Sequence, residues 1–67
     1  MNQERIAELM EYYNAALIAL SAQGKPSRWA RMCYAAEQFH RKYQEISATR
    51  AYLECERASA YGPGGTY

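Results

Sequence analysis

Apolar residues recur at helical spacing over the first third of the chain. They fall every three or four positions and therefore form one face of an amphipathic helix over about residues 3–22. Asn2 is a suitable N-cap for this helix, and Gly24 followed by Pro26 ends it. We call this apolar face the stripe of the helix. It consists of Ile6, Met10, Tyr13, Leu17 and Leu20, and Leu9 and Ala16 widen it.

A second periodic segment follows a turn at residues 23–27. Ser27 is a suitable N-cap, and the next Gly or Pro is Gly62. The sequence therefore predicts one continuous helix over about residues 28–60. The spacing of its stripe alternates between three and four, as in a heptad repeat. The stripe consists of Trp29, Met32, Ala36, Phe39, Tyr43, Ile46, Arg50, Leu53 and Arg57.

These two segments predict an all-α protein whose residues 1–60 form an antiparallel helical hairpin, because a short turn makes successive helices antiparallel neighbours. Residues 61–67 contain three Gly and one Pro. We expect them to form a flexible tail outside the fold.

The two expected helices differ in length, at about 30 Å and about 50 Å. The second helix should extend roughly 20 Å beyond the first. An isolated projecting helix is weakly stable, and a symmetric dimer is the commonest way to cover it. We therefore expect a homodimer or higher oligomer that closes into a four-helix bundle. The expected dimer contacts are Ile46, Arg50, Leu53 and Arg57.

Two of these contacts, Arg50 and Arg57, occupy stripe positions where Leu would be expected. A polar residue at such a position can fix the register of an interface while lowering its stability. The alternative is that the stripe has left the core by Ile46 and both arginines are solvated. Glu54 and Glu56 are available partners in either case.

The size and charge of the chain limit the classes of protein to which it can belong. With 67 residues it is one small domain that buries only about 60% of its unfolded surface, which makes a monomer marginal. A net charge of +1 argues against a strongly basic nucleic-acid binder and against an acidic mimic. The longest apolar run, residues 15–20, is far shorter than the ~20 residues of a membrane span. We expect a cytoplasmic protein with no membrane partner, and we do not expect nucleic acid to be its ligand.

The two cysteines, Cys33 and Cys55, are 22 positions apart in the expected second helix. That spacing corresponds to about 33 Å along a helix, too far for an intrachain disulfide. Free thiols are typical of a reducing compartment.

A basic cluster surrounds Trp29 at the start of the expected second helix. Cations at a helix N-terminus oppose the helix dipole, so stability alone does not favour them there. With the free N–H groups of the first turn they can hold a phosphate or a carboxylate. The alternative is a solvated basic loop with Trp29 packed as a plug over Leu20. The candidate anion-binding residues are Lys25, Ser27, Arg28 and Arg31.

Tyrosine is abundant, with seven residues against one Phe. Three of the seven lie within the expected helices but outside the two stripes, on faces that a hairpin leaves open. Aromatic side chains with a polar end are favoured in interfaces, so these faces are candidates for partner binding or for self-association. The candidate partner-binding residues are Tyr12, Arg28, Trp29, Arg31, Tyr34 and Tyr52.

The sequence also contains an E-x-x-H pattern, Glu37 to His40, with Glu11 opposite it in the expected hairpin. These three residues resemble the ligand pattern of ferritin-like proteins, and the resemblance implies a di-iron helical hairpin. Glu37 and His40 flank the stripe, however, and an exposed Glu37 paired with Arg41 is the preferred interpretation. We therefore assign no metal ligand, no cofactor and no catalytic residue. The single His, the absence of Asp and the lack of a Gly-rich phosphate-binding loop support the assignment of no cofactor and no catalytic residue.

Together these observations favour a small non-enzymatic interaction protein that binds and occludes or bridges a partner macromolecule, in the first place another protein. In size and composition the chain resembles small accessory and inhibitor proteins of mobile elements, including viral ones. An alternative is an oligomeric binder that sequesters a nucleotide or another phosphate-bearing molecule at its basic helix N-termini. The di-iron hairpin is the third.

Overall fold

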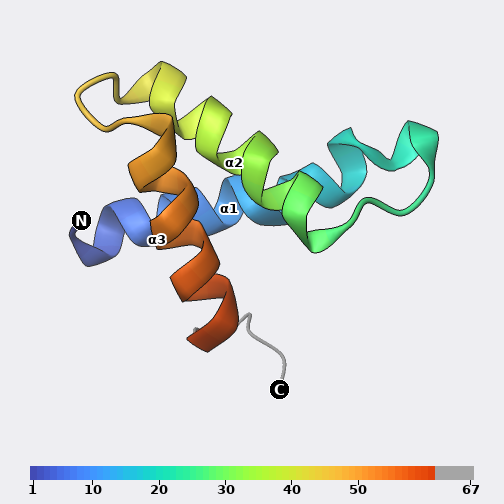
Figure 1. Cartoon of the computed structure of the whole chain (residues 1–67), viewed down its shortest axis with the longest axis horizontal. Helices are drawn as coiled ribbons and strands as arrows, with labels where there is room; N and C mark the ends of the chain where they lie inside the picture. Colours follow the sequence, from blue (N-terminus) through green and yellow to red (C-terminus); the bar gives the residue numbers. More distant parts are fainter. Residues whose placement is uncertain (62–67) are drawn as a thin grey trace.

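The computed structural model describes residues 1–61, which form three α-helices and one short 3-10 helix (Figure 1). The all-α prediction is confirmed, but the continuous helix expected over residues 28–60 is wrong. The predicted tail lies outside the described residues except for Tyr61, which ends the last helix. The elements are α1 (Gln3–Ala19), η1 (Ser21–Gln23), α2 (Arg28–Lys42) and α3 (Ala48–Tyr61).

The first two helices begin where their capping residues predict. The side-chain oxygen of Asn2 accepts a hydrogen bond from the Arg5 N–H at 2.8 Å. The hydroxyl of Ser27 accepts one from the Ala30 N–H at 3.1 Å. Gly24 lies between these helices with φ +101°, a conformation that a residue without a Cβ adopts at little cost. Both predicted N-caps are therefore confirmed.

The expected second helix is interrupted at residues 43–47. Tyr43 leaves the helical region with φ −121° and ψ 81°. The N–H of Ile46 donates to the Tyr43 carbonyl at 3.0 Å, which closes a turn. Ser47 then caps α3, because its hydroxyl accepts a hydrogen bond from the Arg50 N–H at 3.0 Å. No Gly or Pro marks this turn, so the usual signal for a helix end is missing.

The interruption lets α3 fold back and pack against both α2 and α1 (Figure 1). All three helices therefore contribute to one core, in which Phe39, Leu9 and Cys55 are the largest fully buried side chains. Tyr13 and Met32 are also part of this core, and alanines from α2 and α3 let the helices approach closely. The core consists of Leu9, Tyr13, Met32, Ala35, Ala36, Phe39, Ala51 and Cys55.

The buried face of α1 is rotated relative to the predicted stripe. Leu9, Tyr13 and Ala16 are its buried residues, whereas Leu17 is 41% exposed. The predicted stripe assumed that α1 faces one helix. In the structure α1 packs against both α2 and α3, and this moves the centre of its buried face toward Leu9.

The projecting segment from which a dimer was predicted is absent, because its residues form α3 and cover the core of the same chain. The cysteines are also placed differently from the prediction. Cys33 lies on α2 and Cys55 on α3, two helices that pack against each other, and both thiols are free. Within residues 1–61, no helix combines the length and the hydropathy that crossing a bilayer requires.

Replacing Ser47 tests whether the helix is interrupted, because the observed fold and a continuous helix predict opposite changes in the free energy of unfolding. In the observed fold Ser47→Ala removes an N-cap and should lower the free energy of unfolding by about 1 kcal/mol. In a continuous helix the same change should raise it by a few tenths of a kcal/mol, because Ala has the higher helix propensity. Urea unfolding followed by circular dichroism measures the difference.

Ser27→Ala is the matched control, because Ser27 caps α2 with the same geometry. Both variants should be destabilised to a similar extent. A stabilised Ser47→Ala protein beside a destabilised Ser27→Ala protein would contradict the interruption.

Candidate functional site

The end of the molecule that carries the α1–α2 connection has no buried residue between Ala16 and Met32. We call residues 17–31 the loop end. Figure 1 shows it at one end of the long axis, while the α2–α3 turn lies toward the other. Among residues 1–60, whose burial the structure describes, four large apolar side chains are exposed, and the loop end carries three of them. They are Leu17 at 41%, Ile18 at 79% and Trp29 at 65% exposure.

Trp29 extends from the first turn of α2 into solvent. Its exposure of 65% means that it does not form the plug over Leu20 that was one of the two interpretations of this turn. Leu17 and Ile18 belong to the last turn of α1. The loop end therefore presents one aromatic and two aliphatic side chains from the two helices that flank the connection.

Three of the four predicted anion-binding residues of the loop end already have intramolecular partners. Arg28 donates to the Glu56 carbonyl at 3.1 Å and to the Ser59 hydroxyl at 2.8 Å. The Arg31 guanidinium lies 4.1 Å from the centre of the Tyr13 ring and donates to the Tyr13 carbonyl at 3.4 Å. The remaining two residues differ, since the Ser27 hydroxyl caps α2 while Lys25 is exposed in the loop.

The antiparallel packing of α2 and α3 explains why a cation is tolerated at the start of α2. It brings the last turns of α3 to the first turn of α2, within reach of Arg28. A cation near the carbonyl end of a helix is favourable. The charge of Arg28 therefore opposes the dipole of α2 but complements that of α3. The sequence did not reveal this role because α3 was not expected as a separate helix.

The three off-stripe tyrosines predicted to bind a partner are all partly buried. Tyr12 meets the edge of the Phe39 ring at a centroid distance of 6.2 Å, and its hydroxyl donates to Glu8 at 3.2 Å. Tyr34 is half-buried on α2. Tyr52 lies on α3, where burial raises the pKa of its hydroxyl, with the charge of Glu56 adding to the effect. Of the predicted aromatic surface, Trp29 is the exposed member.

An open groove of about 320 Å³ lies between α2 and α3. Its lining is mainly apolar and includes the Tyr52 ring and the Cys33 thiol. The one charged lining residue, Glu37, is exposed and paired with Arg41 at 3.2 Å. The lining residues are Cys33, Ala36, Glu37, Ala48, Thr49 and Tyr52.

The residues predicted to form a dimer contact lie on the turn and on α3. Ile46 is half-buried and packs against the core. Arg50 pairs with Glu54 at 3.3 Å along the helix. Leu53, at 55% exposure, and Arg57 lie on the outer side of α3. Arg50, Leu53 and Arg57 share one face of α3, whereas Ile46 lies in the turn before it.

The three residues that resemble a di-iron pattern have separate surroundings. Glu37 forms the exposed pair with Arg41. Nδ1 of His40 is hydrogen-bonded to the Ile46 carbonyl, and Glu11 is exposed on α1. The described part of the chain contains no group of three or more His, Cys, Asp or Glu side chains that could hold a metal ion.

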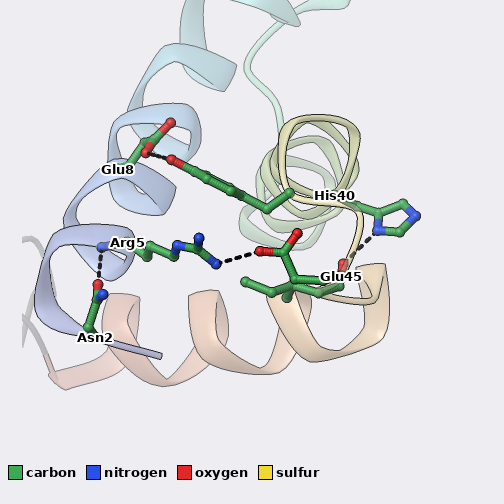
Figure 2. Close-up of polar contacts among 7 residues, drawn as sticks. Asn2, Arg5, Glu8, His40 and Glu45 are labelled. Carbon is green, nitrogen blue, oxygen red and sulfur yellow. Dashed lines mark hydrogen bonds and ion pairs between the residues drawn. The ribbon is translucent and has the colours of Figure 1, made fainter.

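A polar cluster that was not predicted joins α1 to the α2–α3 turn; we call it the turn cluster, and it consists of Arg5, Glu8, Lys42, Tyr43 and Glu45. The Glu8 carboxylate accepts hydrogen bonds from Lys42 Nζ and from the Tyr43 hydroxyl, both at 2.6 Å. Figure 2 shows Arg5 reaching from α1 to Glu45 in the turn, at 2.9 Å. Arg5 also lies 4.2 Å from the centre of the Tyr43 ring.

The antiparallel hairpin expected from the sequence contained a signal for this cluster. With the turn at residues 23–27, facing positions in such a hairpin have numbers that sum to about 49, which places Glu8 near Arg41 and Lys42. The observed partners of Glu8 are Lys42 and Tyr43. The Glu8–Lys42 ion pair could therefore have been predicted from the facing positions of the two helices, whereas the Tyr43 contact depends on the turn that begins at Tyr43.

Glu8 should make stability depend on pH in the acid range. Hydrogen bonds from Lys42 and then Tyr43 hold its pKa below the ordinary value of 4.5. The folded protein therefore binds fewer protons than the unfolded chain near that pH. The stabilisation is fully present above the unfolded pKa and is lost as pH falls through the folded pKa. We expect Glu8→Gln to be less stable than the wild type at pH 7, with the gap closing below pH 4.5.

Glu11→Gln is the matched control, because Glu11 lies on the same helix and is exposed. Its urea midpoint should follow the wild type at every pH. A gap between the wild type and Glu8→Gln that stays constant from pH 7 to pH 3 would show that the Glu8 charge does not hold the turn cluster.

The two thiols should react at very different rates. Burial raises the pKa of Cys55 to about 11 and removes it from solvent, and the thiolate is the reactive form. Cys33 is partly exposed. With a disulfide reagent at pH 8, one thiol per native chain should react rapidly and the second only on unfolding. Cys33→Ser should abolish the rapid phase; equal rapid reaction of both thiols would contradict the placement of Cys55.

Comparisons with protein-family models, with curated proteins and with solved structures found no significant match to this chain.

Proposed function

We propose that this chain is a small non-enzymatic interaction protein that binds another protein through the loop end. The observation that carries the proposal is the exposure of Trp29, Ile18 and Leu17 at an end of the molecule without buried residues. Single exposed apolar residues are common on protein surfaces. Three large ones flanking a single connection are a concentration typical of interaction surfaces.

The energetics of burial support this assignment. A large aliphatic or aromatic side chain gains about 1.5–3 kcal/mol when it is fully transferred from water. A chain of 67 residues has few such side chains to spare from its core. Trp is also the residue type most enriched among those that dominate binding energy. Binding a partner would bury the Trp29 side chain and gain the free energy of burial that this side chain does not contribute in the isolated fold.

The mode of action that fits this surface is occlusion or bridging of the partner. The polar contacts of α2 and the turn cluster hold the helices together. The exposed apolar side chains of the loop end can then enter a concavity on another molecule and block it. Homodimerisation is not part of this proposal, because α3 covers the core face for which a second copy was expected.

A random peptide library displayed on phage tests the surface and does not require the partner to be identified first. Wild-type protein should select binders whose affinity falls at least tenfold for Trp29→Ala, because a buried Trp dominates such contacts. Leu53→Ala is the matched control, since Leu53 is also exposed but lies on α3. It should bind the same peptides with unchanged affinity.

Circular dichroism of Trp29→Ala should match that of the wild type, because the side chain lies outside the core. Binders that are all insensitive to Trp29→Ala, or that depend on Leu53 instead, would contradict the loop end as the binding surface.

A further inference from the structure

We infer that the partner bound by the loop end has an acidic surface, in which carboxylates surround an apolar pocket that receives Trp29. This inference rests on the proposed function and specifies the chemistry of the partner. It follows from how charge is distributed along the chain and how the cations near Trp29 are held.

The charges of the chain are segregated. Residues 12–36 contain Lys25, Arg28 and Arg31, and none of the seven Asp and Glu residues of the chain. The other five cations lie outside this segment together with all the acidic residues, so the remainder of the chain is net negative. The loop end, residues 17–31, therefore carries three cations and no acidic residue of its own, in a protein with a net charge of only +1. Trp29 lies at that end, between Arg28 and Arg31 in the sequence.

Two of these cations have fixed positions. The hydrogen bonds of Arg28 to Glu56 and Ser59 use one terminal nitrogen, Nη2, and the hydrogen bond of Arg31 to Tyr13 uses Nε. A guanidinium carries five N–H donors, so each group retains donors for a further acceptor. Ordered guanidinium groups match the planar carboxylate in a fixed geometry and lose little side-chain entropy on pairing. Ordered guanidinium groups therefore pair well with carboxylates that are also held in fixed positions on a folded protein surface.

Other kinds of binding partner fit the charge distribution of the loop end less well. A symmetric contact with a second copy would place two positive loop ends together, and like charges in an interface oppose association. Nucleic acids and anionic bilayers bind through many mobile cations, each of which adds a small increment to the affinity. The loop end has one extended cation, Lys25, beside two arginines held by the fold. Charge complementarity therefore favours an acidic protein.

The composition of selected peptides tests this directly. The library is panned on wild-type protein in 150 mM NaCl, and binders that also bind Trp29→Ala are removed. The remaining peptides should contain an excess of Asp and Glu over Lys and Arg relative to the unselected library, next to an aromatic or aliphatic residue. Lys25→Glu should weaken their binding about five- to tenfold. Arg57→Glu, the matched charge reversal on α3, should leave it unchanged.

The outcomes separate this inference from the proposed function. Peptides that depend on Trp29 but show no acidic excess would overturn the acidic partner and leave the binding surface intact. The absence of any peptide that depends on Trp29 would overturn both. The fluorescence of Trp29, the only Trp, gives a further test. A blue shift with phosphatidylcholine–phosphatidylglycerol vesicles in 150 mM NaCl would assign the loop end to a lipid surface and overturn the inference.

Discussion

The burial of Phe39 is the interaction on which the fold depends. Its side chain is fully buried on α2, where Tyr12 meets its edge and Tyr43 stacks at a tilt with a centroid distance of 4.8 Å. Two helices alone cannot enclose a ring of this size on all sides. The third side is closed by α3, whose Ala51 and Cys55 are fully buried in the same core. Small residues on α3 let that helix approach closely.

Closing the core in this way determines the remaining features of the surface. The chain must reverse after α2, and the turn cluster fastens this reversal to α1 through Glu8 and Arg5. The reversal brings the end of α3 to the start of α2, where Arg28 ties the two together. The apolar residues needed for the core are then all drawn from residues 9–55, with none between Ala16 and Met32. Trp29 is left in solvent next to ordered cations, which is the basis of the proposed binding surface.

The sequence predicted the local structure well and the tertiary arrangement only in part. The spacing of apolar residues identified the helical segments, and Asn2 and Ser27 were recognised as caps because their chemistry acts within one turn. The turn at residues 43–47 was missed because it contains neither Gly nor Pro. Heptad-like spacing continues across it, since Ile46 and Leu53 fall in phase with Phe39. One residue, Ser47, marked the start of α3, and a Ser inside a helix has the same appearance in the sequence.

The candidate site was predicted to a similar extent. Trp29 was selected because aromatic side chains with a polar end are favoured in interfaces, a property that does not depend on the tertiary fold. Arg28 and Arg31 were selected because cations at a helix start oppose its dipole, but their partners, Ser59 and Tyr13, lie far away in the sequence. The burial of Tyr12 depends on the Phe39 ring and could not be derived from its position on α1 alone. Long-range packing therefore decides which candidates remain exposed.

The most direct measurement of the central claim is the set of nuclear Overhauser contacts of the Phe39 ring in the isolated chain. A core closed by α3 predicts cross-peaks from this ring or its immediate core neighbours to the Ala51 methyl and the Cys55 β-protons. It also predicts that helical sequential contacts stop at Tyr43 and resume after Ser47. Uninterrupted helical contacts through residues 43–47, without cross-peaks from the core to Ala51 or Cys55, would contradict the account.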